Sequence, residues 1–393
     1  MSGVLENFGA TGASEIAAVS LMAGLGILFL ERMTFAGQSA LFILGILAWL
    51  VSGLISYSAN AVPAPQDTLE LLMLLLLYGL FANACFAHLA QPTSVPGIYR
   101  FIRAFILVGG ALAIFQVVTG TGFVEEGKAQ IQRAFGSDVH PVSFAIQMVA
   151  ALVVLECIRS KTGQHRGLWY ITIMAVGIAV LYLTYARTAW IMALITLAFA
   201  FSASASRPTK LVFLVVGAPI LLVVLVTSDR FSNLNGLSLF LSNFTLDNLV
   251  FDYRYIDNSV SWRIVNWGYG FQQALEKPML GFGPGQSASS SYFNLEMHNI
   301  FLETFFEGGV FGLAAFLILL SGLFRIHRLM PRQSKSDHYC CALANGFGLS
   351  LLLAVFFSTS FVDQLMSFIL YFLLLTIAAI PSHEHVEIQH LKD

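Results

Sequence analysis

The chain alternates long apolar runs with short polar connections. Eleven of these runs approach the length, about 20 residues, that an α-helix needs to cross the hydrocarbon core of a bilayer. Within that core only helices or closed barrels satisfy the backbone, and runs of this length favour helices. The pattern predicts one all-α integral membrane domain over residues 1–393, a polytopic bundle of about 11–12 transmembrane helices. The predicted spans are 14–30, 39–57, 68–88, 98–118, 140–158, 167–184, 188–205, 211–227, 299–322, 341–360 and 363–380.

Positive charges predict how the bundle is oriented. Thirteen of the 20 Lys and Arg residues fall in connections on one side, and only three fall in short connections on the other. Connections rich in Lys and Arg stay in the cytoplasm, whereas charges in long loops count for little. The longest connection, residues 228–298, is therefore predicted to be a large periplasmic loop of an inner-membrane protein.

Composition narrows the class of protein further. Hydrophobic residues make up 57% of the chain and charged residues 11%, with a mean hydropathy of +0.77. A soluble domain carries about a quarter charged residues. The net charge of −2 gives no general attraction to nucleic acid. The four cysteines have no metal-ligand spacing, so we expect neither a metal site nor a disulfide framework.

The segment SWRIVNWGYGFQQALEKP in the long loop is predicted to form a helix. Arg263, Trp267 and Phe271 are spaced at i, i+4 and i+8, which places them on one face of a helix lying at the membrane interface. Pro278 ends the helix, and the glycine-rich turn LGFGPGQS follows. Taken alone, this segment favours a solvated Arg263 on an amphipathic helix over a ligand-binding arginine.

The next segment, MHNIFLETFFEGGVFG, opens a predicted span at its outer mouth. Asn299, Glu303 and Glu307 share one helix face, and two carboxylates inside a membrane are costly unless they are paired or wet. Their presence predicts a polar cavity on this side. A histidine at a helix start is usually an ordinary interfacial residue, but beside a cavity and several arginines His298 becomes a candidate general base. Glu303 and Glu307 remain alternatives for that role.

Two further arginines are predicted to lie on the outer side. Arg187, in LTYARTAW, stands where two spans meet in a connection too short to be a flexible loop. The simpler interpretation is an arginine that anchors a helix end at the interface. Arg133 lies in QIQRAFGSDVHPVSF, just before the span that opens near Pro141. Gly308 and Gly312 form a small-xxx-small pair, which is typical of close helix packing.

At these segments the sequence resembles the bacterial O-antigen ligase and O-antigen/exopolysaccharide polymerase family. LTYARTAW is similar to the family's arginine hairpin, and SWRIVNW with KPMLGFGPG to its Arg-x-x-x-Trp helix and Pro-x-x-Gly-x-Gly turn. MHNIFLETFFEGGVFG resembles its outer His motif, and RAFGSDVHPVSF its Arg-x-x-Gly…Pro segment. In that last segment Val142 follows Pro141, where the family usually has Asn. The four pieces span roughly residues 130–320.

The resemblance implies an activity, a fold and a set of partners. The activity is transfer of a glycan from undecaprenyl diphosphate to a sugar hydroxyl, without a cofactor. The acceptor is a lipid A–core sugar for a ligase, or the end sugar of a second lipid-linked glycan for a polymerase, and both alternatives stay open. The fold belongs with lipid-donor glycosyltransferases of about twelve spans. Membrane lipids are expected partners, and a chain-length regulator is a further candidate.

A diphosphate leaving group would explain why arginines gather on the outer side. Its negative charge grows as the glycosidic bond breaks, and planar guanidinium groups match phosphate oxygens without a metal. We therefore expect a metal-independent, inverting glycosyltransferase. The expected catalytic residues are His298, Arg187 and Arg263, and the expected substrate-binding residues are Arg133, Arg254, Asn299, Trp267 and Glu303.

Two other classes of protein would also explain the spans. A transporter or lipid-glycan flippase would carry charges deep within several helices, and here the central stretches are nearly free of charge. A structural or assembly protein leaves the outward arginines unexplained. Glycan transfer is the function that accounts for most of the residues singled out above.

Overall fold

The computed structural model describes Gly37 and residues 40–60, 65–124, 132–136, 140–163, 167–204, 259–291, 296–357 and 365–381. Within these ranges the chain is almost entirely helical, with one pair of two-residue strands. The elements are α3 (Ala40–Ala59), α4 (Pro65–Ala84), the short helices η1 (Cys85–Leu89) and η2 (Pro92–Ser94), α5 (Val95–Thr119), β1 (Phe123–Val124), β2 (Gln132–Arg133), α6 (Pro141–Thr162), α7 (Leu168–Thr184), α8 (Arg187–Ser204), α12 (Ser259–Ala274), α13 (Ser287–Ser290), α14 (Ile300–Leu329), α15 (Lys335–Phe357) and α16 (Leu365–Ala379).

Helices of the described ranges occupy nine of the eleven predicted spans. Six helical segments in these ranges are long and apolar enough to cross a membrane, and α7, α8 and α16 are shorter apolar helices. The all-α polytopic membrane fold is therefore confirmed. The predicted spans at 14–30 and 211–227 lie outside the described residues, as does most of the predicted loop at 228–298.

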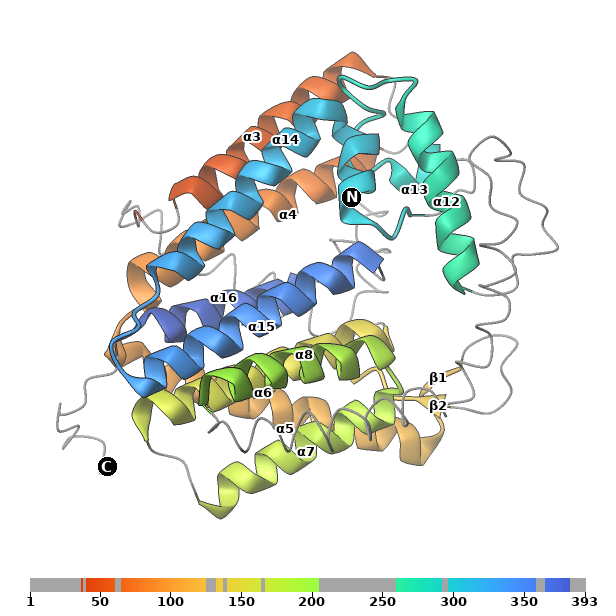
Figure 1. Ribbon diagram of the computed structural model, residues 1–393. Helices are drawn as coiled ribbons and strands as arrows, with labels where there is room; N and C mark the ends of the chain where they lie inside the picture. The colour runs from red at the N-terminus through yellow and green to blue at the C-terminus, as the bar shows by residue number, and fades with distance from the viewer. Residues whose placement is uncertain are drawn as a thin grey trace.

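The helices lie roughly side by side in three groups (Figure 1). One group holds α3, α4 and α14, a second holds α15 and α16, and a third holds α5 to α8. Within and between these groups α14 packs along α3, α15 along α8, and α16 against α6. The α3–α14 pair crosses at glycines, because a Cβ atom on Gly45 would collide with Leu319, and one on Gly322 would collide with Phe42. Small residues let helix backbones approach closely in membranes.

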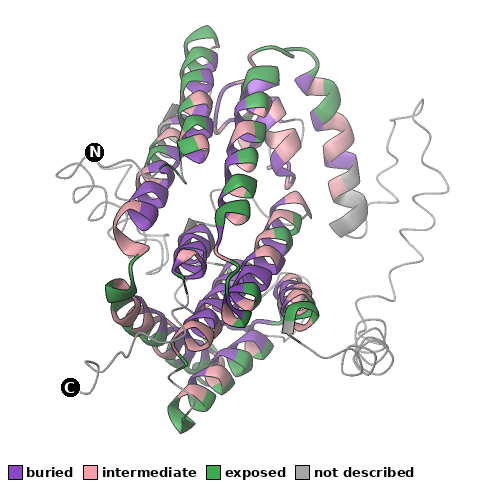
Figure 2. Cartoon of the chain, turned by 60° about the vertical axis from the view of Figure 1, so that its left-hand side comes forward, coloured by how far each residue is buried: buried purple, intermediate pink, exposed green. Residues whose placement is uncertain are grey.

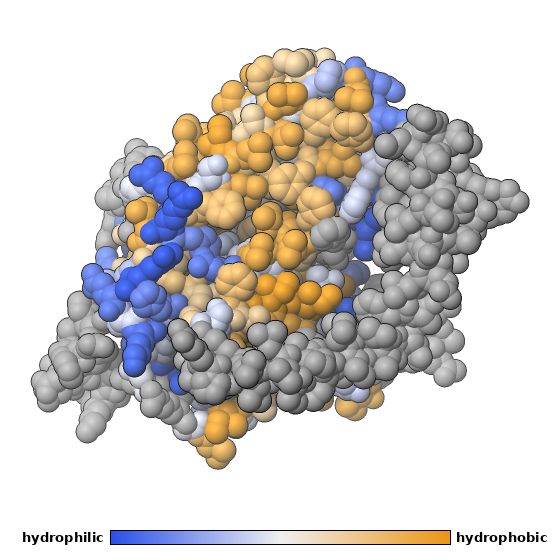
Figure 3. All heavy atoms as spheres, viewed as in Figure 1, coloured by the Kyte–Doolittle hydropathy of each residue, from blue (hydrophilic) through white to orange (hydrophobic). Residues whose placement is uncertain are grey.

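Burial follows the position of each helix in the bundle. Helix α6 is buried along most of its length, whereas the outer helices carry exposed faces (Figure 2). Many exposed side chains are large and apolar, including Val118 and Leu168, each 79% exposed. An apolar belt therefore lies between more polar ends (Figure 3). An exposed apolar belt of this extent is expected where lipid replaces water around a bundle.

The two ends of the bundle differ in chemistry. The basic end carries the α6–α7 and α14–α15 connections, with Arg325, Arg328, Arg332 and Lys335 around the second of them. The site end carries β1, β2, the α7–α8 connection, α12 and α13 (Figure 1).

Ion pairs and hydrogen bonds join three helices at the basic end. Glu156 of α6 accepts hydrogen bonds from Arg159 Nε at 2.7 Å, from Tyr339 Oη at 2.9 Å and from Tyr170 Oη. Lys161 of α6 forms an ion pair with the buried carboxylate of Asp337. Because these partly or fully buried charges have partners, they help to hold the three helices together at this end.

Candidate active site at the site end

Helix α12 confirms the predicted helix and shows what its polar face does. Trp267 Nε1 donates to the carbonyl oxygen of Met297 at 2.7 Å, and Asn266 Nδ2 donates to that of Glu296 at 2.8 Å. Both bonds hold the two residues that precede His298. Phe271, the third residue of the predicted face, packs its half-exposed ring on Phe305. A role for Trp267 in substrate binding stays a prediction.

His298 occupies a strained position at the start of α14. Its φ of 50° is in the left-handed region that favours glycine, so the surrounding bonds must hold it there. On one side Met297 is fully buried and tied to α12. On the other, Asn299 caps α14, its Oδ1 accepting from the backbone N–H groups of Phe301 and Leu302, each at 3.1 Å.

The surroundings of His298 favour its neutral form. Burial lowers the pKa of His298 below its ordinary value of 6.5, and the charges of Arg263 and of a protonated His140 lower that pKa further. The ring atom Nδ1 is buried and has no hydrogen-bond partner among the described residues. A neutral imidazole with an unoccupied ring nitrogen is suited to accept a proton.

Arg263 comes close enough to His298 for its charge to act on the ring. It lies in the first half of α12, at the end nearer β1 and β2 in Figure 1. Burial lowers the pKa of Arg263, but a guanidinium starts so far above neutral pH that it stays charged. The structure therefore brings together two of the three predicted catalytic residues, and it adds His140, which the sequence did not single out.

The α7–α8 connection is the tight hairpin that the sequence predicted. Helix α7 ends at Thr184 and α8 begins at Arg187, with Tyr185 between them at φ 52°. Arg133 Nε donates to the carbonyl oxygen of Thr184 at 2.9 Å. Arg133 is thus buried against the hairpin whose next helix begins with Arg187. Contact of either arginine with a substrate stays a prediction.

Gln116 of α5 holds the segment that follows Arg133. Its Oε1 accepts from the backbone N–H groups of Phe135 and Gly136, and its Nε2 donates to the Gly136 carbonyl at 2.8 Å. Gly136 has a φ of 56°, and a Cβ atom there would collide with the ring of Phe144. Only glycine fits at this position of the Arg-x-x-Gly segment, because any side chain would collide with Phe144.

Helix α14 is interrupted at Gly309, a feature that the hydropathy pattern did not predict. The φ of 61° and ψ of −155° at Gly309 break the helix, so Val310 N donates to Pro278 O at 2.9 Å. A Cβ atom on Gly309 would collide with the backbone of Met279. Gly308 and Gly312, expected at a helix contact, both face α3, because a Cβ atom on either glycine would lie 3.7 Å from Ser52 Oγ.

The predicted acidic face of α14 points at α13. Glu303 Oε1 accepts from Ser287 Oγ, and Glu307 Oε1 accepts from Ser287 N, each at 3.0 Å. Both carboxylates thus accept a hydrogen bond from Ser287, at the site end of the bundle. Arg254, the remaining predicted substrate-binding residue, lies outside the described residues.

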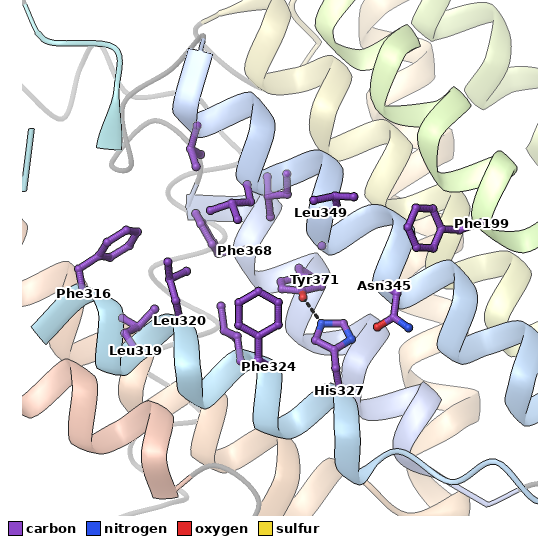
Figure 4. A pocket seen from close by; sticks show the side chains of 15 residues that line it. Phe199, Phe316, Leu319, Leu320, Phe324, His327, Asn345, Leu349, Phe368 and Tyr371 are labelled. Atoms are coloured by element: carbon purple, nitrogen blue, oxygen red, sulfur yellow. Dashed lines mark hydrogen bonds between the residues drawn. The ribbon is translucent and has the colours of Figure 1, made fainter. Parts of the chain in front are cut away.

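A separate apolar cavity lies away from these residues (Figure 4). Its volume is about 280 Å³, and it opens between α8, α14, α15 and α16. His327 Nε2 and Tyr371 Oη lie 2.5 Å apart in its wall, with Asn345 nearby. None of the predicted site residues that the structure describes lines this cavity, so it adds nothing to the candidate active site.

The fold and the site together define a polytopic α-helical membrane protein with arginines and a neutral histidine gathered at one end. Residues 172–317 match the family model described as O-antigen ligase. The match includes the α7–α8 hairpin, α12, the glycine-rich turn and His298, and it supports the O-antigen ligase and polymerase family for this chain. The resemblance predicted from the motifs is confirmed over that range. No curated protein matches the chain.

Proposed function

We propose that the protein transfers a glycan from undecaprenyl diphosphate to an acceptor sugar hydroxyl at the periplasmic face of the bacterial inner membrane. The observation that carries this proposal is the partly buried His298, held near Arg263 between α12 and the cap of α14, inside the range that matches the O-antigen ligase model. O-antigen ligase and polymerase-type glycan transfer is the activity that the family match supports in general.

The roles of the residues follow from the charges that the reaction moves. Arg263 and Arg187 bind the diphosphate and stabilise the charge that grows as it leaves. A ring nitrogen of His298 takes the proton of the acceptor hydroxyl, whose oxygen forms the new bond to the anomeric carbon. The bond from that carbon to the diphosphate breaks, and its electron pair leaves with undecaprenyl diphosphate. One direct displacement inverts the anomeric carbon and needs neither a metal nor a covalent intermediate.

The proposed orientation places the site end in the periplasm. The support is the group of Arg325, Arg328, Arg332 and Lys335 around the α14–α15 connection at the opposite, basic end, together with the bias of Lys and Arg along the sequence. The proposed single membrane domain covers residues 1–393, and residues 228–298 form its periplasmic loop. Ligase and polymerase activities remain equally supported, and they differ in the acceptor, a lipid A–core sugar or a second lipid-linked glycan.

Purified protein in lipid vesicles provides the test. Undecaprenyl-diphosphate-linked glycan is supplied with either acceptor, and the product is measured for the unmodified protein, Arg263→Ala and Arg187→Ala. Each substitution is expected to lower the transfer rate about 100-fold or more, as loss of a charge-stabilising donor does. Arg325→Ala removes an exposed arginine at the basic end and is expected to transfer at the wild-type rate.

Each outcome of this test has a distinct meaning. Normal transfer by either alanine variant would remove that arginine from the site. Movement of the lipid-linked glycan across the bilayer without transfer to any acceptor would instead show a flippase. The acceptor that is used separates ligase from polymerase.

A further inference from the structure

The break in α14 leaves backbone carbonyls that a continuous helix would have used. Val310 N, which would pair with Phe306 O in an α-helix, donates to Pro278 O instead. The carbonyl oxygens of Phe306 and Glu307 then accept from Phe282 N at 2.9 Å and Gly283 N at 3.0 Å. Backbone hydrogen bonds therefore hold the glycine-rich turn against the break. In one of them α14 is the donor, and in the other two it is the acceptor.

Glu307 is the residue on which these bonds converge. Its carbonyl oxygen accepts from Gly283 N and also from Ser56 Oγ of α3 at 3.2 Å. Its carboxyl group accepts from Ser287 N at the start of α13. One residue, only 5% exposed, therefore ties α14 to the turn, to α13 and to α3.

The segment held by Glu307 connects the two groups of the proposed site. Arg263 lies on α12, which leads directly into the turn and α13, whereas His298 precedes Asn299, the cap of α14. Helix α12 is also bound to the residues before His298 through Trp267. The separation of Arg263 and His298 is consequently set at two points, by the α12–Met297 bond and by the attachment of the turn and α13 to Glu307.

We infer that Glu307 is a positioning residue for glycan transfer: its carboxyl group, by holding α13 and the preceding turn on α14, fixes Arg263 relative to His298. This inference rests on the proposed function. The carboxyl group acts as a hydrogen-bond acceptor for Ser287 N and takes no proton from the acceptor sugar. Misplacing catalytic groups by about 1 Å can lower a rate about 100-fold, so loss of this attachment is expected to act on kcat.

The first experiment compares Glu307→Ala and Glu307→Gln in the vesicle assay. Glu307→Ala is expected to lower kcat about 100-fold with little change in the KM for the donor, because the diphosphate still meets Arg263 and Arg187. Glu307→Gln is expected to keep most of the wild-type kcat and the same pH profile, because an amide oxygen still accepts from Ser287 N. An equal loss in both variants would show that the charge itself is needed and would overturn the inference.

A matched control comes from the same helix. Thr304 is buried about one turn before Glu307, and its Oγ1 donates to Ile300 O within α14 at 2.6 Å. Thr304→Val is expected to transfer at the wild-type rate, because the lost bond attaches no other element. If Glu307→Ala yields no folded protein, Glu307→Asp keeps the charge but shortens the side chain by one methylene, and its kcat is expected to fall in the same direction.

Hydrogen exchange separates this inference from the proposed function. In Glu307→Ala the backbone amides of the turn, α13 and residues 296–298 are expected to exchange faster, with unchanged exchange at the basic end. Unchanged exchange in the turn and α13 would overturn the attachment itself. If the unmodified protein transfers no glycan, the proposed function has failed, and the exchange result still decides whether Glu307 holds this segment.

Discussion

His298 shows how a single residue acquires its chemistry from its neighbours. The left-handed backbone of His298 is held by the cap at Asn299 and by the bond between Trp267 and Met297. Burial and the nearby charge of Arg263 lower the pKa of its ring and so favour the neutral form, as does His140 when it is protonated. Two residues expected to bind substrate, Asn299 and Trp267, are thus used to set the position of the proposed base.

The pH dependence of transfer tests the proposed base. Because the pKa of His298 is lowered, its neutral form persists below pH 6.5, and activity is lost as the pH falls through that lowered value. The value of kcat/KM, which reports the free enzyme, should therefore still exceed half its maximum at pH 6.5 and decline in more acidic medium. His298→Gln is expected to lower the plateau about 100-fold or more.

A change at His140 provides the control for this pH profile. His140 caps α6 through its Nδ1, which accepts from Val142 N at 3.2 Å, and Asn is also a good N-cap residue. A protonated His140 lowers the pKa of His298 by its charge, so in His140→Asn the acid decline should move to higher pH. A profile that stays in place, or a His298→Gln variant with normal rate and profile, would contradict the assignment of His298 as the base.

At the scale of elements, short connections hold the predicted arginines. The α7–α8 hairpin, the Arg133 segment and Gln116 of α5 form one bonded unit at the site end. Arg187 is therefore the first residue of α8, and Arg133 is bonded to the end of α7. Residues held in this way are already ordered before a ligand binds. Binding of the proposed diphosphate would then cost less conformational entropy.

Gly136→Ala tests this unit. The methyl group would collide with Phe144, and the φ of 56° adds backbone strain of about 1–3 kcal/mol for a residue other than glycine. Both the melting temperature and the transfer rate are expected to fall. Gly163→Ala is the matched control, because Gly163 has a similar φ of 65° but no atom within 4 Å of the added methyl group. Equal losses in the two variants would show that backbone strain alone is responsible.

The sequence predicted elements better than the contacts between them. Hydropathy located nine described spans, and helical spacing placed Arg263 and Trp267 on α12, because these features depend on local pattern. The break at Gly309 was missed, since it depends on backbone groups of Pro278 and Phe282 that approach only in the folded chain. His140 was missed for the same reason: its charge matters through its distance from His298.

At the scale of the whole molecule, polarity divides the bundle between a basic end and a site end. The apolar belt between them is wide enough to cross a membrane. The two ends must then face opposite sides of that membrane, and the distribution of Lys and Arg predicts which side each end faces.

Cysteine labelling tests this orientation. Ser289 is an exposed residue at the site end, and Gln333 is an exposed residue of the α14–α15 connection at the basic end. In intact cells with a permeabilised outer membrane, a membrane-impermeant thiol reagent should label Ser289→Cys and spare Gln333→Cys. Native Cys85, Cys157, Cys340 and Cys341 are buried, which keeps the background low. Labelling of Gln333→Cys alone would reverse the proposed orientation.

The break in α14 also bears on how the protein responds to bilayers of different thickness. A spanning helix adjusts to hydrophobic mismatch by tilting. Beyond Gly309, α14 is packed on α3 near Gly322, whereas its first turns are bonded to the glycine-rich turn. The break lets the two parts of α14 take different directions, but Ser56 of α3 bonds to Glu307 before the break, so α3 links both parts. A change in membrane thickness is therefore expected to reach the candidate site through α3 as well as through α14.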